Sequence, residues 1–581
     1  MHSDQDNGAT LIIDPTETDA HGATLDTDPT ATDVDAVIIG AGFSGLYMLH
    51  RLRDVLGLSV RSFEAGAGVG GTWYWNRYPG ARCDTDAYVY CYSFSKELLQ
   101  EWEWSGKYPE QPEILSYLNH VADRFDLRRS IQFETFVTTA TFDDHRNRWN
   151  VETNRGDRLS AQFLIMGIGH LSISKYVPKL KGLETFQGEW HHTADWPTEP
   201  VDFTGKKVGV IGTGSTGIQA IPVIARQAAH LTVFQRSPQY TVPARHETVD
   251  RNFLDEVKAN YDEIWETSRW SAGGMPWQHN GISALDVTDD ERLATYEALW
   301  KQGGFKFALA SYRDLALDRR ANDTVSEFIR SKIREVVKDP ETQAKLMPTD
   351  YPFLARRPII DTNYFETYNR DNVTLADLRH FPIKTVTPTG ILTEEGEFEL
   401  DILVFATGFD AITGPFFNID PRGRHGVKLT DTWRDGPRGY LGLQTADFPN
   451  MFMITGPGCV PGNIPVSVEH HVEWISDCLE YMRVNGFKTV EATREAEATW
   501  TAHVNEQAER SLISLADSWF TGANIPGKVR AYVFYFGHYG RYRQKTQDVV
   551  RDGYNGFVFD GDTSPRCLPE DATEDAFSVY P

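Results

Sequence analysis

Two glycine-rich turns of the form G-x-G-x-x-G occur in the chain, and each could hold the pyrophosphate of a dinucleotide. Their glycines are Gly40, Gly42 and Gly45 in the first turn and Gly212, Gly214 and Gly217 in the second. A side chain at these positions would block the approach of a pyrophosphate, which is stabilised by the N-terminus of the following helix. Each turn lies between an apolar strand and an amphipathic helix in a β-α-β order, so the context favours two nucleotide sites.

The residue that ends the second strand differs between the two units. Glu64 lies 24 positions after Gly40, and Arg236 lies 24 positions after Gly212. A carboxylate accepts hydrogen bonds from free ribose hydroxyls, whereas a guanidinium pairs with a 2′-phosphate. We therefore expect FAD at the first turn and NADPH at the second, with the hydroxyl of Ser237 also on the phosphate. The alternative is that Arg236 is an ordinary surface arginine.

Between the two turns the chain reads F-Q-G-E-W-H-H-T-A-D-W-P. This segment resembles the F-x-G-x-x-x-H-x-x-x-W-P fingerprint of the Baeyer–Villiger monooxygenases, flavoproteins that use NADPH and oxygen to insert one oxygen atom beside a ketone carbonyl. No nearby motif supplies a partner that would orient the histidine as a base. The resemblance instead implies a linker that couples domain movement to NADPH binding. It is carried by Phe186, Gly188, His192, Trp196 and Pro197.

The segment G-V-G-G-T-W-Y-W-N-R-Y-P-G-A-R-C-D resembles the part of these enzymes that covers the flavin. The resemblance implies that Asp84 lies near the reactive face of the isoalloxazine ring. By composition alone, the same segment could be a packed core loop. The residues that the resemblance places around the ring are Thr72, Trp73, Asp84 and Tyr90.

A third match, Y-P-F-L-A-R-R-P-I-I-D, contains two adjacent arginines. The resemblance places Arg356, where relatives usually have lysine, on the 2′-phosphate, and it makes Arg357 the active-site arginine. A permanent cation in a water-poor pocket can stabilise a deprotonated peroxyflavin and then a tetrahedral alkoxide. Asp84 can hold that cation in place. We therefore predict Arg357 and Asp84 as catalytic residues, although two adjacent arginines alone are more often a solvated surface.

Two C-terminal segments complete the resemblance. The stretch A-D-S-W-F-T-G-A-N-I-P-G-K resembles a mobile loop whose tryptophan, here Trp519, reaches the nicotinamide cofactor or the substrate. Its indole N–H can only donate a hydrogen bond. The stretch around Cys459 to Pro461 should line the substrate side of the flavin, in a region where relatives vary, so substrate size does not carry over.

Composition restricts the kind of partner. The chain of 581 residues has a net charge of −25, which disfavours nucleic acid or an anionic membrane as a partner. Its five cysteines form no C-x-x-C pair, so we expect no disulfide framework, no metal site and no disulfide reductase. No apolar run is long enough for a membrane span, and no signal peptide is recognisable. A cytoplasmic enzyme is expected, with an undetermined oligomeric state.

The predicted fold class is α/β, with two Rossmann-like domains and a helical insertion in the second. The insertion is expected because residues 245–350 turn to charged, helix-periodic sequence. The predicted organisation is an acidic tail (1–33), the FAD domain (34–170 and 399–560), the NADP domain (171–244 and 351–398), the insertion (245–350) and a second tail (561–581).

The sequence therefore predicts an FAD- and NADPH-dependent enzyme that converts a small-molecule ketone and O2 into an ester or lactone through a peroxyflavin. Three alternatives remain open. The chain could oxygenate nitrogen or sulfur, it could reduce its flavin and release hydrogen peroxide, or it could be a non-enzymatic flavin sensor. The W-P ending of the fingerprint and the arginine pair count against the first alternative, and the arginine pair would be unnecessary in the last. The particular ketone is not identified by the sequence.

Overall fold

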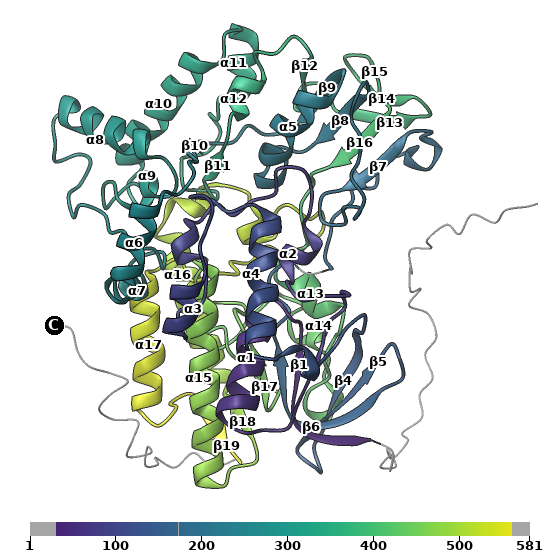
Figure 1. Cartoon of the computed structure of the whole chain (residues 1–581), viewed down its shortest axis with the longest axis vertical. Coiled ribbons are helices and arrows are strands. Elements are labelled where there is room, and N and C mark those ends of the chain that lie inside the picture. Colours follow the sequence, from purple (N-terminus) through teal and green to yellow (C-terminus); the bar gives the residue numbers. More distant parts are fainter. Residues whose placement is uncertain (1–30, 172, 561–581) are drawn as a thin grey trace, which may run out of the picture.

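The computed structural model describes residues 31–171 and 173–560, which form two bodies, each built around a β-sheet (Figure 1). The predicted tails lie outside the described residues, apart from residues 31–33. The first strand begins at Thr32, two residues before the predicted start of the first domain, because Thr32 and Asp33 pair with Leu159 and Ser160 of a neighbouring strand.

The lower body in Figure 1 holds a seven-stranded mixed sheet. Its strands are β1 (Thr32–Ile39), β2 (Val60–Phe63), β3 (Ile131–Gln132), β4 (Val137–Asp143), β5 (Arg148–Thr153), β6 (Arg158–Met166) and β17 (Met451–Met453). They are ordered β3-β2-β1-β6-β5-β4, and β17 pairs in parallel with the C-terminal half of β6. The last four residues of β1 are fully buried, as expected for a parallel strand covered on both faces.

Helices complete the first body. They include α1 (Phe43–His50), α4 (Gln111–Arg124), α15 (Ile464–Asn485), α16 (Arg494–Glu509) and α17 (Tyr539–Arg551). α15 is the longest of them and packs against α1, although the two are separated by more than half of the chain (Figure 1). The first body therefore combines an N-terminal and a C-terminal part of the sequence. Among the described residues, no helix combines the length and apolar character that crossing a bilayer requires.

The upper body holds a fully parallel sheet ordered β12-β9-β8-β16-β7. Its strands are β7 (Glu189–His192), β8 (Lys207–Ile211), β9 (His230–Gln235), β12 (Val373–Asp377) and β16 (Ile402–Phe405), and α5 (Ser215–Gln227) connects β8 to β9. Smaller sheets are formed by β10 (Thr241–Pro243) with β11 (Ile359–Asp361), and by β13 (Ile383–Thr387), β14 (Gly390–Thr393) and β15 (Glu397–Glu399). The predicted α/β class with two Rossmann-like units is confirmed.

One predicted boundary is wrong. Residues 399–560 were assigned to the first domain, but β16 pairs with β8 on one side and with β7 on the other, in the middle of the second sheet. The apolar run I-L-V-F is buried on both faces there, and the chain returns to the first body only after Phe405. A buried strand alone does not indicate which of the two sheets it joins, so the pattern could not place this strand.

The predicted insertion is helical and contacts both bodies. It contains α6 (Arg251–Ala259), α7 (Tyr261–Trp270), α8 (Asp289–Gln302), α9 (Lys306–Leu309), α10 (Arg319–Val336) and α11 (Pro340–Leu346). α8 begins with a complete capping box between Thr288 and Glu291. α7 packs against α17 of the first body, and Lys96 forms an ion pair with Asp262 at 3.0 Å.

The two glycine turns have the same geometry. The amide of Gly40 donates to Phe63 O at 2.8 Å, and the amide of Gly212 donates to Phe234 O at 3.1 Å. Gly40 and Gly212 have φ of +102° and +108°, values that favour glycine. A Cβ on the third glycine would lie 1.8 Å from Gly40 O at Gly45, and 2.2 Å from Gly212 O at Gly217. Close contact between turn and helix therefore explains these glycines without a ligand.

We expect Gly217→Ala and Gly214→Ala to differ sharply in stability. The new methyl at 217 would collide with a backbone carbonyl, whereas a Cβ at 214 would meet nothing within 4 Å. Overpacking at a rigid contact costs about 1–3 kcal/mol. Thermal unfolding should show a lower Tm for Gly217→Ala and an almost unchanged Tm for Gly214→Ala. Equal losses in the two variants would contradict the packing explanation.

Candidate active site

A cavity of about 1020 Å³ lies between the two bodies, and both glycine turns open into it. The ends of β2 and β9 contribute Glu64 and Arg236 to the same cavity. The carboxyl ends of parallel strands at a change of strand order are the usual site of nucleotides in such folds. The predicted site residues that line this cavity are Gly40, Gly42, Glu64, Thr72, Trp73, Asp84, Tyr90, Gly212, Gly214, Arg236, Ser237, Arg356, Arg357 and Trp519.

The first turn has the backbone-only surface that a pyrophosphate needs. Gly42 faces Gly71 so closely that a Cβ on Gly42 would lie 3.3 Å from Gly71 Cα. Gly70 and Gly71 have φ of +133° and +53°, which favours glycine at both positions. Glu64 is buried at the end of β2, and its carboxylate accepts hydrogen bonds from Ala41 N at 2.7 Å and Gly66 N at 2.8 Å. These features fit a dinucleotide such as FAD.

Burial affects the charge of the Glu64 carboxyl. Desolvation raises its pKa, while the backbone N–H groups of Gly66 and Ala41 act in the opposite direction. One oxygen accepts from Ala41 of the first turn and the other from Gly66 of the segment after β2, so Glu64 also holds these two segments together. A carboxylate has further lone pairs, and these can accept hydrogen bonds from ribose hydroxyls.

Positive charge gathers beside the second turn. Arg236 is exposed at the end of β9, and no carboxylate in residues 31–171 or 173–560 forms an ion pair with it. Arg356 stacks on the ring of Tyr351 at 4.0 Å, and its buried Nε lacks a hydrogen-bond partner within the described part of the chain. Unneutralised guanidinium groups at one end of a cavity fit the 2′-phosphate of NADPH.

An ion pair between two residues that line the cavity joins the two bodies. Arg357 Nη2 donates to the two carboxylate oxygens of Asp84 at 2.9 and 2.8 Å, and its Nε lies 3.3 Å from Oδ2. Burial acts to lower the pKa of Arg357, but the Asp84 carboxylate raises it above the usual value. Arg357 therefore keeps its positive charge.

Two aromatic groups restrict Arg357 and its surroundings. The guanidinium lies over the ring of Phe305 at 5.0 Å, at the start of α9 in the helical insertion. The preceding Gly304 has φ of +65°, and a Cβ there would lie 1.8 Å from Tyr108 Oη. On the other side, Trp73 Nε1 donates to Tyr90 Oη at 3.1 Å. Burial raises the pKa of Tyr90, so its hydroxyl stays protonated.

The C-terminal loop reaches the cavity from the first body. Trp519 lies in a short 3₁₀ helix (Trp519–Thr521) and contacts the rings of Phe520 and Phe534 at 4.7 and 5.5 Å. Further along the loop, Asn524 Nδ2 donates to Phe409 O at 2.7 Å, and Lys528 forms an ion pair with Asp410. The loop is thus attached to the segment that follows β16.

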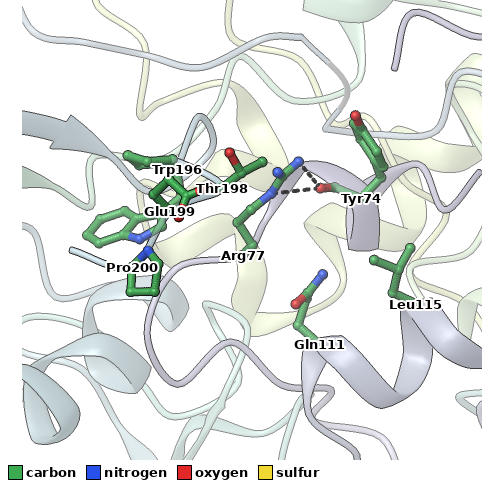
Figure 2. Close-up of a pocket in the computed structure, with 9 residues that line it drawn as sticks. Tyr74, Arg77, Gln111, Leu115, Trp196, Thr198, Glu199 and Pro200 are labelled. Carbon is green, nitrogen blue, oxygen red and sulfur yellow. Dashed lines mark hydrogen bonds between the residues drawn. The ribbon is translucent and has the colours of Figure 1, made fainter. Parts of the chain in front are cut away.

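The fingerprint does not line the main cavity. Residues 189–192 form the edge strand β7, and Gly188 is required because a Cβ there would lie 2.3 Å from Asp401 O. Phe186 packs into the core of the second body. Trp196 and Pro197 instead line a separate cavity of about 380 Å³, together with Tyr74 and Arg77 of the first body. Figure 2 shows Trp196, Tyr74 and Arg77 in this cavity.

His192 is held in one orientation by the backbone. Its Nε2 lies 3.2 Å from Tyr176 O, and its Nδ1 accepts a hydrogen bond from Ala194 N at 3.0 Å. Burial lowers the pKa of His192 to about 4, so the ring is neutral at pH 7. Both ring nitrogens thus contact backbone groups.

Sequence reasoning missed several residues that line the cavity or contact the ion pair. Phe305 lies in the insertion, where periodicity indicates a helix but not the direction of a side chain. The turn 406–409, which directly follows β16, also lines the cavity. Tyr78 and Gln219 also line it. Tyr78 lies between Thr72 and Asp84, and Gln219 lies two residues after Gly217. Closeness in sequence to these predicted site residues was therefore the signal that could have identified them.

Comparisons with known proteins agree with this geometry. Residues 34–248 match the family described as flavin-binding monooxygenase-like. A Baeyer–Villiger monooxygenase of Pseudooceanicola batsensis is 48% identical over 528 residues, which cover 90% of this chain and 96% of the relative. Phenazine N-monooxygenase PhzNO1 of Lysobacter antibioticus is 45% identical, covering 91% and 98%. The structure of oxidized steroid monooxygenase bound to NADP is similar with a TM-score of 0.87 and 49% identity, covering 91% and 99%.

The buried His192 predicts acid sensitivity. Its folded-state pKa of about 4 lies below the ordinary value of 6.5, so the unfolded chain binds more protons between these two pH values. Its contribution to stability is present above pH 6.5 and is lost as the pH falls toward 4, by roughly 3 kcal/mol at most. The Tm of the wild type relative to His192→Gln, measured at pH 7.5 and at pH 5, should fall at the lower pH. A pH-independent difference would contradict this assignment.

Proposed function

The chain belongs to the Baeyer–Villiger monooxygenases, and on this premise we propose that it uses NADPH and O2 to convert a small-molecule ketone into an ester or a lactone. The observation that carries the proposal is the Asp84–Arg357 ion pair, which lies in one cavity with both glycine turns. A fixed, half-buried cation next to two dinucleotide turns suits oxygen transfer to a carbonyl, because negative charge develops in that reaction, whereas flavin reduction alone does not require it.

The chemistry divides between cofactors and protein. Bound FAD, once reduced by NADPH, supplies an activated oxygen atom from O2. Arg357 stabilises the negative charge that develops on the transferred oxygen and on the substrate's carbonyl oxygen, because a fixed cation in a water-poor cavity needs no reorganisation. Asp84 orients the guanidinium through two oxygen contacts and keeps it charged.

We assign the remaining cavity residues to binding. The first turn, Glu64, Thr72, Trp73 and Tyr90 hold FAD in the body that combines residues 32–170 with the segment after β16. The second turn holds NADPH, with Arg236, Ser237 and Arg356 on its 2′-phosphate. Trp519 donates its indole N–H to the nicotinamide cofactor or the substrate. The fingerprint residues lie outside this cavity and act through the connection between the bodies.

A cytoplasmic location is also proposed. The four cysteines within the described ranges are free and buried, as expected for a reducing compartment. The fifth, Cys567, lies outside those ranges.

Nitrogen oxygenation is a second candidate because one relative of similar identity is a phenazine N-monooxygenase. That relative and this chain match over nearly their full lengths. Reaction at a nitrogen lone pair forms no alkoxide on a carbonyl carbon, so its rate should depend less on Arg357. The two functions are therefore separable by product and by the effect of removing this arginine.

The product of the reaction tests the proposal. Purified protein should be incubated with NADPH, ¹⁸O2 and a panel of linear, cyclic, steroidal and aromatic ketones, with phenazine and a sulfide as competing substrates. Mass spectrometry should find an ester or lactone that carries one ¹⁸O atom per NADPH consumed. Arg357→Ala should lower this rate roughly 100-fold or more. The exposed Arg370→Ala is the matched control and should keep the rate of the wild type.

Other products would redirect the assignment. If phenazine N-oxide forms and no ketone reacts, the nitrogen oxygenase is correct. If hydrogen peroxide accounts for all of the NADPH consumed with every substrate, the chain is a reductase and the role of Arg357 fails.

Arg236 should determine the choice of nicotinamide cofactor. Loss of a charge-assisted contact to the 2′-phosphate costs about 1.5–3 kcal/mol, so Arg236→Ala should raise the KM for NADPH by roughly 10- to 100-fold. The KM for NADH should stay nearly unchanged because NADH lacks this phosphate. Arg226→Ala, an exposed arginine on α5, is the matched control. Equal increases for both cofactors would show that Arg236 acts on protein structure and not on the phosphate.

A further inference from the structure

One glutamine side chain of the second body binds the segment of the first body that carries Asp84. Gln219 lies on α5, one turn after the second glycine loop. Tyr78 Oη donates to Gln219 Oε1 at 2.8 Å, and Arg82 N donates to the same oxygen at 3.4 Å. In return, Gln219 Nε2 donates to Arg82 O at 3.1 Å. The amide therefore uses both of its ends across the boundary between the bodies.

The backbones of the two segments also meet at this point. Gly80 has φ of +82°, and a Cβ there would lie 2.5 Å from Gln219 O and 2.9 Å from Val223 Cγ2. No other residue type fits without moving α5 away. Residues 78–84, which we call the strap, therefore lie directly on α5. Gln219 binds the strap at Tyr78 and Arg82, and Arg357 binds it at Asp84.

These two attachments connect the second nucleotide turn to the ion pair. Ser215 and Thr216 begin α5 and line the cavity, and Gln219 follows within the same helix. A helix is stiff over one turn, so a displacement at its first residues is passed to Gln219. The ion pair fixes Asp84 relative to Arg357, and the Gln219 amide, which both donates and accepts, fixes the strap relative to α5.

We propose that Gln219 is a positioning residue. It fixes the position of Asp84 relative to Arg357 in response to the position of the second nucleotide turn. The proposal rests on the function assigned above to Arg357. Gln219 transmits the position of α5 to the strap through the Tyr78 hydroxyl and the Arg82 backbone. Without it, the strap keeps its hydrogen bonds within the first body, from Cys83 N to Pro109 O and from Gln111 N to Ala81 O, but it is no longer fixed relative to α5. The position of Asp84 relative to Arg357 then varies, and the two electrons of NADPH reduce O2 to hydrogen peroxide instead of supporting transfer of one oxygen atom to the ketone.

Hydrogen–deuterium exchange tests the connection without requiring catalysis. In FAD-loaded wild-type protein, NADP⁺ should slow exchange of peptides that contain residues 78–84, because an ordered second turn holds Gln219 on the strap. In Gln219→Leu, which keeps the size but removes both hydrogen-bonding ends, the NADP⁺ effect on these peptides should be lost. Gln162→Leu is the matched control, since the Gln162 amide bonds Lys488 O within the first body.

Turnover gives the second readout. Gln219→Leu should raise the fraction of NADPH that ends as peroxide by roughly 3- to 10-fold and lower kcat for the ketone, while the KM for NADPH changes by less than about 3-fold. Tyr78→Phe should act in the same direction but less strongly. The double variant should equal Gln219→Leu alone, because both substitutions remove the same hydrogen bond.

The outcomes separate this inference from the proposed function. If Gln219→Leu keeps both the NADP⁺ protection of the strap and the wild-type peroxide fraction, the positioning role is refuted. The role is also refuted if the effects of Tyr78→Phe and Gln219→Leu are simply additive. If wild-type protein oxygenates no ketone but the exchange effect depends on Gln219, the connection is supported and only the proposed reaction fails.

Discussion

The ion pair between Asp84 and Arg357 is the interaction on which the arrangement of the site depends. It joins a loop of the first body to a loop of the second, in a cavity from which much of the solvent is removed. A guanidinium in such a place is costly unless a carboxylate compensates it. Neighbouring residues help to hold the pair in place. Phe305 lies against the guanidinium, and Gly304 allows Tyr108 to approach the segment that carries Phe305. Gln219 holds the strap that carries Asp84.

The two nucleotide turns have the same backbone conformation, although we assign them different ligands. Their hydrogen bonds and glycine conformations are nearly the same. The difference lies in charge, with the buried Glu64 at the end of one strand and the exposed Arg236 at the end of the equivalent strand. Local sterics thus explain the shared motif, and the side chain at the strand end explains the difference between the two sites.

Much of the fold and of the site was predictable from the sequence because it depends on local patterns. Glycine spacing and apolar strands located both β-α-β units, and helix periodicity located α8 and α10. The position of β16 was not predictable, because the sequence of a strand buried on both faces does not indicate which sheet the strand joins. The contact of Phe305 with Arg357 and the hydrogen bonds of Gln219 depend on the approach of distant segments, which spacing along one chain does not encode.

The position of β16 has a consequence for the order in which the protein folds. All strands of the second sheet lie between Glu189 and Phe405, so that sheet can close as soon as this stretch has left the ribosome. The first sheet is complete only when Met451–Met453 pairs with Leu164–Met166, and α15 must then pack on α1. Contacts between such distant segments form slowly. The nascent first body therefore carries an open strand edge on β6 and an uncovered face on α1 while the second body is already folded.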